Sequence, residues 1–262
     1  IVGRWRVAAP DVVYNLAQTL AWPLYPRYRR HTIYSPPVEY AAWIGRLLTQ
    51  RRRDAAVGAL ARRLGQQYGS VFVHALQLDG DFQVRASAFG SQTPAIRTVI
   101  ASFARHAPAP AQLVFKTHPL DNGLERWGRL IAQTATDAGV PDRVHLADGG
   151  SLPAWLACVE GLVTLNSTAG LEALQAAVPV ATLAPAVYAL DGLTHQGPLD
   201  TFWSAPPRPD AGLLDDLVAV IAATTQVPGS LYDARGLADA VAGIAGRIVA
   251  FAPSPRPVAA AA

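Results

Sequence analysis

The sequence is poor in several residue types that carry specific chemistry. It has one cysteine, Cys158, and one lysine, Lys116, beside 21 arginines, and it contains no methionine. A single cysteine excludes an intramolecular disulfide and is typical of a reducing compartment, and its apolar neighbours predict a core position. Because the chain begins at Ile1 and lacks methionine, we expect a fragment or a processed product.

Long apolar segments are also absent. No run approaches the roughly 20 residues that a membrane-spanning helix needs. The first residues lack the apolar region of a signal peptide. These two absences favour a cytoplasmic protein.

The net charge of +3 conceals an asymmetry along the chain. Residues 1–65 carry 11 arginines against three acids, giving +8, whereas residues 66–262 carry 11 basic residues against 16 acids, giving −5. A basic segment can attract anionic lipid or a charged polysaccharide, but the solvated face of an amphipathic helix explains it more simply. No nucleic-acid-binding motif is present, so we expect no nucleic-acid partner. The buried stripe of this helix would be formed by Trp43, Leu47, Leu48, Val57, Leu60 and Leu64.

From residue 71 onward, strand-like and helix-like stretches alternate, which predicts an α/β fold: a Rossmann-like parallel sheet with helices on both faces. We expect a basic, mainly helical segment over residues 1–70, the Rossmann-like domain over 71–252 and a disordered tail over 253–262. The predicted strands cover residues 71–77, 113–117, 144–147, 162–165 and 179–183. The predicted helices cover residues 94–106, 124–138, 151–159, 168–176, 213–223 and 237–251, the last with Leu237, Val241, Ile244 and Ile248 inward.

Ligands of open α/β sheets bind outside the carboxyl ends of the strands, so polar residues at strand exits are candidate site residues. Four predicted exits are rich in them. The first carries Gln77, Asp79, Asp81, Gln83 and Arg85; the second Lys116, Thr117, His118 and Pro119; the third Asn166, Ser167, Thr168, Gly170 and Glu172; and the fourth His195, Gln196, Asp200 and Trp203.

The third exit has the clearest mechanism, because a helix amino terminus attracts phosphate through its free N–H groups. The hydroxyls of Ser167 and Thr168 add donors, Gly170 allows close approach, and Glu172 is placed to accept from ribose hydroxyls. Taken alone, an ordinary N-cap explains the same residues more simply. Lys116 would add positive charge from a neighbouring strand.

Asp79 and Asp81 are candidates for a nucleophile or a base, but a turn around Gly80 also explains their spacing. As a metal site, two carboxylates at this spacing are a weak signal. There is no P-loop, no G-x-G-x-x-G after a strand and no Cys/His cluster, so we expect neither a metal nor a cofactor.

Taken together, five segments resemble the capsule polysaccharide biosynthesis and export family of bacterial β-Kdo transferases, which act on the acidic sugar Kdo. The resemblance runs from about residue 27 to residue 233, and the order and spacing of the segments are more specific than any one of them. The segments are "RYRRHTIYSPPVEYAAW", "LQLDGDFQVR", "LVFKTHPLDNG", "LNSTAGLEALQAAVPVATL" and "YALDGLTHQGPLDTFW".

The resemblance implies a glycosyltransferase of the GT-B type, in which two Rossmann-type domains enclose a cleft. This chain would supply the carboxyl-terminal domain, since it is shorter than a complete enzyme of that type. The implied reaction transfers Kdo from CMP-Kdo to a phosphatidylglycerol-type, anionic lipid acceptor with retention of configuration. The protein would then work with the capsule assembly and export machinery, peripherally at the inner membrane.

The resemblance also implies roles for individual residues. Asp81, with Asp79 beside it, would be the catalytic carboxylate that forms a covalent glycosyl-enzyme. Nucleotide binding falls to Lys116, His118, Pro119, Asn166, Ser167, Thr168, Gly170 and Glu172, and sugar or acceptor binding to Gln77, Gln83, Arg85, His195 and Gln196. Two alternatives stay open: another nucleotide-sugar transferase or epimerase, and a non-enzymatic export or assembly component.

Overall fold

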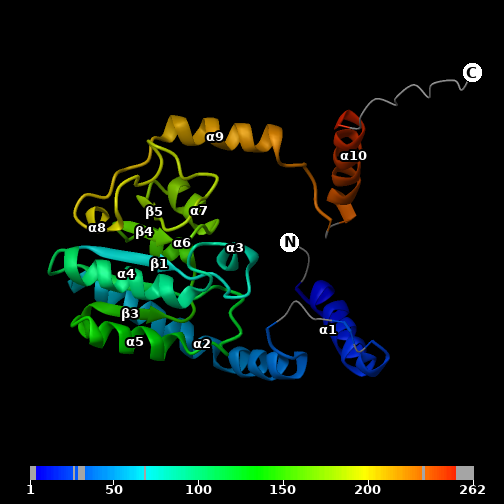
Figure 1. Ribbon diagram of the computed structural model, residues 1–262, viewed down its shortest axis with the longest axis horizontal. Coiled ribbons are helices and arrows are strands. Elements are labelled where there is room, and N and C mark those ends of the chain that lie inside the picture. The colour runs from blue at the N-terminus through cyan, green and yellow to red at the C-terminus, as the bar shows by residue number, and fades with distance from the viewer. Residues whose placement is uncertain (1–3, 26, 29–32, 68, 232–233, 252–262) are drawn as a thin grey trace, which may run out of the picture. The chain divides into compact units, whose positions relative to one another are not determined.

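The structure, a computed structural model, describes residues 4–25, 27–28, 33–67, 69–231 and 234–251 (Figure 1). The chain forms two compact units: a sheet unit, residues 30–216, and a terminal unit, residues 1–29 with 217–262. These units do not coincide with the predicted division at residue 70, because the helix over residues 36–67 belongs to the sheet unit. The predicted tail lies outside the described residues.

The sheet unit contains a five-stranded parallel sheet of order β3-β2-β1-β4-β5, so the predicted α/β fold is confirmed. Strand order reverses between β1 and β4, which makes that boundary the topological switch point. The strands are β1 (Val71–Ala75), β2 (Gln112–Lys116), β3 (Val144–Ala147), β4 (Gly161–Thr164) and β5 (Val180–Thr182).

Helices connect the strands and cover both faces of the sheet. The four helices predicted between the strands are all present, and three of them are shorter than predicted. The helices of the sheet unit are α2 (Pro36–Gln67), α3 (Phe82–Arg85), α4 (Gln92–His106), α5 (Trp127–Asp137), η2 (Pro141–Arg143), α6 (Leu152–Leu156), α7 (Ala169–Gln175) and α8 (Leu199–Phe202). Ser151 caps α6, because its hydroxyl accepts a hydrogen bond from the Ala154 N–H.

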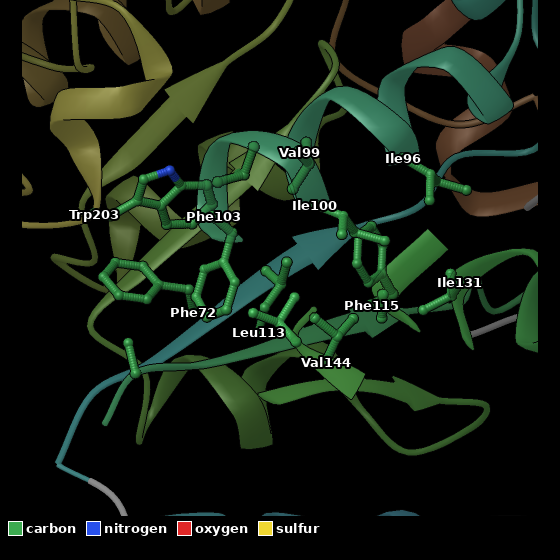
Figure 2. Packing of buried hydrophobic residues seen from close by; sticks show 14 of the residues in the cluster. Phe72, Ile96, Val99, Ile100, Phe103, Leu113, Phe115, Ile131, Val144 and Trp203 are labelled. Atoms are coloured by element: carbon green, nitrogen blue, oxygen red, sulfur yellow. The ribbon is translucent and has the colours of Figure 1, made fainter. Parts of the chain in front are cut away.

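The main core lies between one face of the sheet and helices α4 and α5 (Figure 2). The sequence produces this layer because apolar residues of α4 recur at helical spacing while alternate strand residues face the same side. Trp203 packs edge-on against Phe72 and Phe103, with ring centroids 5.2 and 5.3 Å apart. Its indole N–H donates to Ser102, whose hydroxyl donates to Asp200. Trp203, predicted at a strand exit, is therefore part of the core, and Asp200 is a partly exposed residue at its edge.

Several burial predictions are wrong. On α2, Val57 and Leu64 are buried, but Leu47 and Leu48 are exposed by 61% and 81%. The reason is helical spacing. The side of α2 that packs against the rest of the sheet unit carries Arg46, Arg53 and Val57, whereas Leu47 and Leu48 lie on its exposed side. Cys158 is exposed rather than buried, because α6 ends before it at Leu156.

The terminal unit holds α1 (Arg4–Leu20), η1 (Trp22–Leu24), most of α9 (Ala211–Thr224) and α10 (Ala234–Phe251). The Arg247 guanidinium donates to three carbonyl groups at the end of α9 and just beyond it. The predicted inward stripe of α10 is exposed. Its buried side carries small residues instead, where Gly236 and Ala240 meet Gly229. Among the described residues, no helix combines the length and apolar character of a membrane span.

Candidate functional site

The switch point of the sheet carries a direct contact between two predicted site residues. Gln77 follows β1 and Asn166 follows β4; the Gln77 amide donates to Asn166 Oδ1 over 3.1 Å, and the Asn166 N–H donates back to Gln77 Oε1 over 3.3 Å. Gln77 is buried. The pair therefore joins the two loops at the edge where ligands of such sheets bind, and it supports the site more than it exposes groups to a ligand.

Lys116 is the last residue of β2 and is buried, with Nζ donating to the Thr117 carbonyl over 3.1 Å. Because strand side chains alternate, Lys116 points to the opposite face from Phe115 and the main core. Burial lowers the pKa of its ammonium, while the charges of Asp148, Glu172 and Asp54 work against that shift. The only lysine of the chain is thus a partly desolvated cation among carboxylates at the strand exit.

The loop after β3 is held by arginines of α2, a contact that the sequence analysis missed. Asp148 accepts hydrogen bonds from Arg46 at 2.8 Å and from Arg53 at 3.5 Å, and Thr117 donates to it at 3.2 Å. Burial raises the pKa of Asp148, but the hydrogen bond and charge of Arg46 and the charge of Arg53 outweigh it, so the net shift is downward. Part of the arginine run of α2 therefore has a structural role, which the charge pattern alone could not distinguish from a solvated face.

Asp148→Ala should lower the free energy of unfolding by about 1–3 kcal/mol, because it leaves two partly buried guanidinium groups without their carboxylate. The folded-state pKa lies below the unfolded one, so the contribution is present at neutral pH and is lost as pH falls through the folded pKa. Urea denaturation at pH 7 measures the effect. Arg62→Ala, at an exposed position of the same helix, is the control and should change little; equal losses in both variants would contradict the assignment.

His118 lies just past β2, and its Nδ1 accepts a hydrogen bond from the Leu120 N–H over 3.1 Å. The neutral ring therefore carries its proton on Nε2, which can donate to a ligand. Burial lowers the pKa of His118, the charge of Asp81 raises it, and the charge of Lys116 lowers it further, with a net downward shift. His118 is thus a neutral donor at pH 7 rather than a cation. Pro119, next to it, is exposed.

Asp79 and Asp81 have different surroundings. Asp79 Oδ1 accepts from the Gln92 N–H at 2.7 Å and so caps α4. Asp81 precedes α3; its backbone carbonyl accepts from Val84 and Arg85, but its carboxylate makes no capping hydrogen bond. The charge of the Asp81 carboxylate acts on His118, as does that of Asp121, whereas Asp79 is engaged at the start of α4.

The start of α7 is more fully occupied than the sequence suggested. The N–H groups of Asn166, Ser167, Ala169 and Gly170 already donate to protein oxygens. Ser167 Oγ is one of those acceptors, so its own hydroxyl proton stays available for donation. The space beside Gly170 is filled by Tyr188, whose hydroxyl donates to the Ser167 carbonyl. Phosphate contacts here would come from hydroxyl groups rather than from backbone N–H groups.

The remaining predicted residues are less closely grouped. Thr168, which directly precedes α7, and Glu172, in its first turn, are both exposed. Glu172 is close enough for its charge to act on Lys116. Gln83 and Arg85 are exposed on the short helix α3.

The structure does not bring His195 and its neighbour Gln196 to this edge. The ring of His195 packs against Phe202, and Phe202 contacts Gly161, the first residue of β4. His195 therefore lies toward the amino ends of the strands, where its Nε2 pairs with Thr201 Oγ1 and the Pro198 carbonyl. The Gln196 amide donates to Thr194. The prediction failed because the chain after β5 turns back along the sheet and makes an isolated bridge at Ala181.

A cavity of about 290 Å³ adjoins Asp81 in the sheet unit, between residues 33–43 and the loops after β1 and β2; we call it the acidic-aromatic cavity. The Tyr34 hydroxyl donates to Glu125 over 2.5 Å, and the Trp127 indole donates to Asp121 over 2.9 Å. No group of three or more possible metal ligands occurs among the described residues. The cavity is lined by Ile33, Tyr34, Glu39, Trp43, Leu78, Asp79, Gly80, Asp81, Leu120, Asp121, Asn122, Glu125 and Trp127.

Of these lining residues, only Asp79 and Asp81 were predicted as site residues. Residues 34–43 belong to the first segment that carried the family resemblance, but no role was assigned to them. The signal was the combination of one acid, Glu39, and three aromatic residues between 34 and 43. Nothing local in the sequence placed that segment beside the exits of β1 and β2.

Comparison with known proteins gives two relatives that are similar in sequence. The chain is 32% identical over 216 residues to the capsule polysaccharide export protein KpsS of Escherichia coli, covering 79% of this chain and 54% of KpsS. It is 31% identical over 211 residues to the capsule polysaccharide modification protein LipB of Neisseria meningitidis, covering 79% of this chain and 50% of LipB. The chain thus spans about half the length of these relatives.

Solved structures show more distant likenesses. The β-Kdo 2,7 transferase KpsC of Thermosulfurimonas dismutans is 19% identical with a TM-score of 0.40, covering 65% of this chain and 54% of that one. HepE of Anabaena, solved with UDP-glucose, is 15% identical with a TM-score of 0.35, covering 74% and 48%. The family model described as capsule polysaccharide biosynthesis protein matches residues 4–232. The chain therefore belongs to the capsule polysaccharide biosynthesis protein family.

Proposed function

We propose that this chain is part of a retaining glycosyltransferase that transfers Kdo from CMP-Kdo to a phosphatidylglycerol-type lipid. The observation that carries the proposal is the grouping of hydrogen-bond donors and one carboxylate around the switch point. Lys116 ends β2, and His118 and Ser167 follow β2 and β4; these three residues offer donors for a phosphate. Asp81 follows β1, and its charge acts on His118. Membership of the capsule family and the likeness of the five segments to β-Kdo transferases support the choice of donor.

In this proposal the residues have distinct roles. The neutral Nε2–H of His118 and the hydroxyls of Ser167 and Thr168 donate to the single phosphate of CMP, with the Lys116 ammonium behind them. Asp81 attacks the anomeric carbon, and the bond from that carbon to the CMP phosphate breaks, which leaves a glycosyl-enzyme and free CMP. The acceptor hydroxyl then attacks the same carbon from the vacated side, loses its proton and frees Asp81. Two displacements give retention.

Two roles complete the proposal. Arg85 is proposed to hold the carboxylate of the sugar. Asn166, through Gln77, keeps the loops after β1 and β4 in place. The second domain of a GT-B enzyme would come from the part of the relatives that this chain does not span.

Nucleotide preference tests the proposal directly. CMP at 100 times its Kd should stabilise the protein by about 2.7 kcal/mol, which is several degrees in Tm, whereas UDP and GDP should have little effect. His118→Ala should weaken CMP binding about 10–100-fold, because it removes a hydrogen bond to a charged group. His106→Ala, at the carboxyl end of α4, is the matched control. Stabilisation by UDP but not CMP would replace the proposed donor, and no response to any nucleotide would remove the transferase assignment.

A further inference from the structure

The acidic-aromatic cavity adjoins the proposed nucleotide site but differs from it in charge. Five of its lining side chains are carboxylic acids, and no described lining residue is basic. The acids affect Tyr34, which lines the same cavity. Its pKa rises to about 12 through its hydrogen bond to Glu125, burial, and the charges of Glu125, Asp79 and Asp121. A negatively charged group would therefore be repelled, because like charges close together in a partly solvated site raise each other's energy.

The same lining suits a different kind of ligand. Ionised carboxylates accept hydrogen bonds but cannot donate them, so they select groups that carry hydroxyl or amine protons. Trp43 and Trp127 add aromatic surface, and Ile33, Leu78 and Leu120 add apolar surface. A sugar or polyol matches both features of the lining: its hydroxyl groups can donate to the carboxylates, and its C–H groups can pack on the aromatic and apolar side chains. The volume of about 290 Å³ lies near the lower end for small-molecule pockets, so it fits a small group.

The position of the cavity connects it to the chemistry. Asp81 lines it, and the charge of the same carboxylate acts on His118. We infer that the acidic-aromatic cavity binds the uncharged polyhydroxyl part of a substrate beside Asp81 and excludes its negatively charged groups. Only the link to a transferase substrate rests on the proposed function; the binding preference stands on the cavity itself. A sugar carboxylate or a lipid phosphate must then lie outside the cavity, where Arg85, Lys116 and His118 are found; none of these three lines it.

Matched sugar probes test this preference by saturation-transfer NMR and titration with the purified protein. Methyl glucoside and methyl glucuronide have the same ring and differ in one carboxylate. We expect the glucoside to bind at millimolar concentration and the glucuronide at least tenfold more weakly. Methyl glucosaminide, which carries an ammonium group on the same ring, tests the cationic alternative and should bind within about threefold of the glucoside.

Variants locate the binding within the cavity. Trp43→Leu should weaken glucoside binding at least fivefold, whereas Trp22→Leu, at an exposed tryptophan of the terminal unit, should leave it unchanged. The double variant D81N/E125Q should reduce the discrimination against the glucuronide to threefold or less. If Trp43→Leu does not fold, the double variant and the wild-type preference still decide the matter.

Three results would overturn the inference: equal or stronger binding of the glucuronide, tenfold preference for the glucosaminide, or no binding of any of the three sugars. The outcome is separable from that of the nucleotide test. Glucoside binding without any effect of CMP would leave the cavity assignment intact and remove the proposed donor. Stabilisation by CMP without sugar binding would leave the proposed donor intact and remove the cavity assignment.

Discussion

Asp81→Asn is expected to reduce sugar transfer by at least about 10³-fold while leaving CMP affinity within twofold of wild type. The amide keeps the size of the side chain but cannot form a stable ester with the anomeric carbon. No capping hydrogen bond depends on the carboxylate of Asp81, so the fold should be unaffected. Intact-protein mass spectrometry after incubation with CMP-Kdo gives a second readout, since wild type should gain the mass of one Kdo residue and the variant should not.

Asp79→Asn is the matched control for this experiment. Its amide oxygen can still accept the hydrogen bond from the Gln92 N–H, so α4 stays capped and transfer should continue. Asp79→Ala removes the cap and should cost about 1 kcal/mol of stability without abolishing turnover. Retained turnover in Asp81→Asn would exclude Asp81 as the nucleophile, and loss of turnover in Asp79→Asn would move the catalytic role to Asp79.

The difference between these two aspartates shows how far local sequence can be interpreted. Each is a carboxylate beside Gly80, and their spacing fits both a turn and a catalytic pair. Only the tertiary structure separates them, because the acceptor role of Asp79 depends on the start of α4, 13 residues later. The strands and helices were predictable because their apolar spacing is a local property, and the parallel order follows from their alternation.

The site was predictable where it depends on strand exits and unpredictable where it depends on distant segments. Gln77 and Asn166 meet across 89 residues because both follow strands that are neighbours in the sheet. The contact of Arg46 with Asp148 spans 102 residues and follows from no periodicity in the sequence. The predicted position of His195 was wrong although its segment has the composition of a strand exit. The residue instead packs against Phe202, toward the amino ends of the strands.

His118 illustrates a further limit, since residue type alone predicts charge poorly at a buried edge. Next to a lysine, burial and the lysine charge together keep the imidazole neutral, despite the carboxylate of Asp81. A neutral donor can still bind phosphate through one hydrogen bond. It also leaves the Lys116 ammonium as the charged group beside that donor.

His74→Leu is expected to remove about 2 kcal/mol of the stability that the protein loses between pH 6.5 and pH 4.5. His74 lies in β1 and is fully buried against Phe115, with a ring-centroid distance of 5.1 Å. Neither of its ring nitrogens has a hydrogen-bond partner in the described part of the chain. Burial lowers its pKa from 6.5 to about 3. Leucine has a similar volume and no polar atoms, so it should also leave stability at pH 7.5 unchanged or raise it by about 1–2 kcal/mol.

The sign of the pH effect follows from where the proton binds. Below pH 6.5 the unfolded chain takes up a proton at His74 while the folded chain does not, so acid favours unfolding. The loss approaches about 1.4 kcal/mol per pH unit and totals about 2 kcal/mol between pH 6.5 and pH 4.5, because the unfolded chain is only half protonated at His74 at pH 6.5; this is a sizeable share of a typical free energy of unfolding. Urea denaturation of wild type and variant at both pH values measures it. Val73→Ala, on the same strand, should destabilise equally at both, and a His74→Leu protein that loses as much stability as wild type would show that His74 does not carry the acid sensitivity.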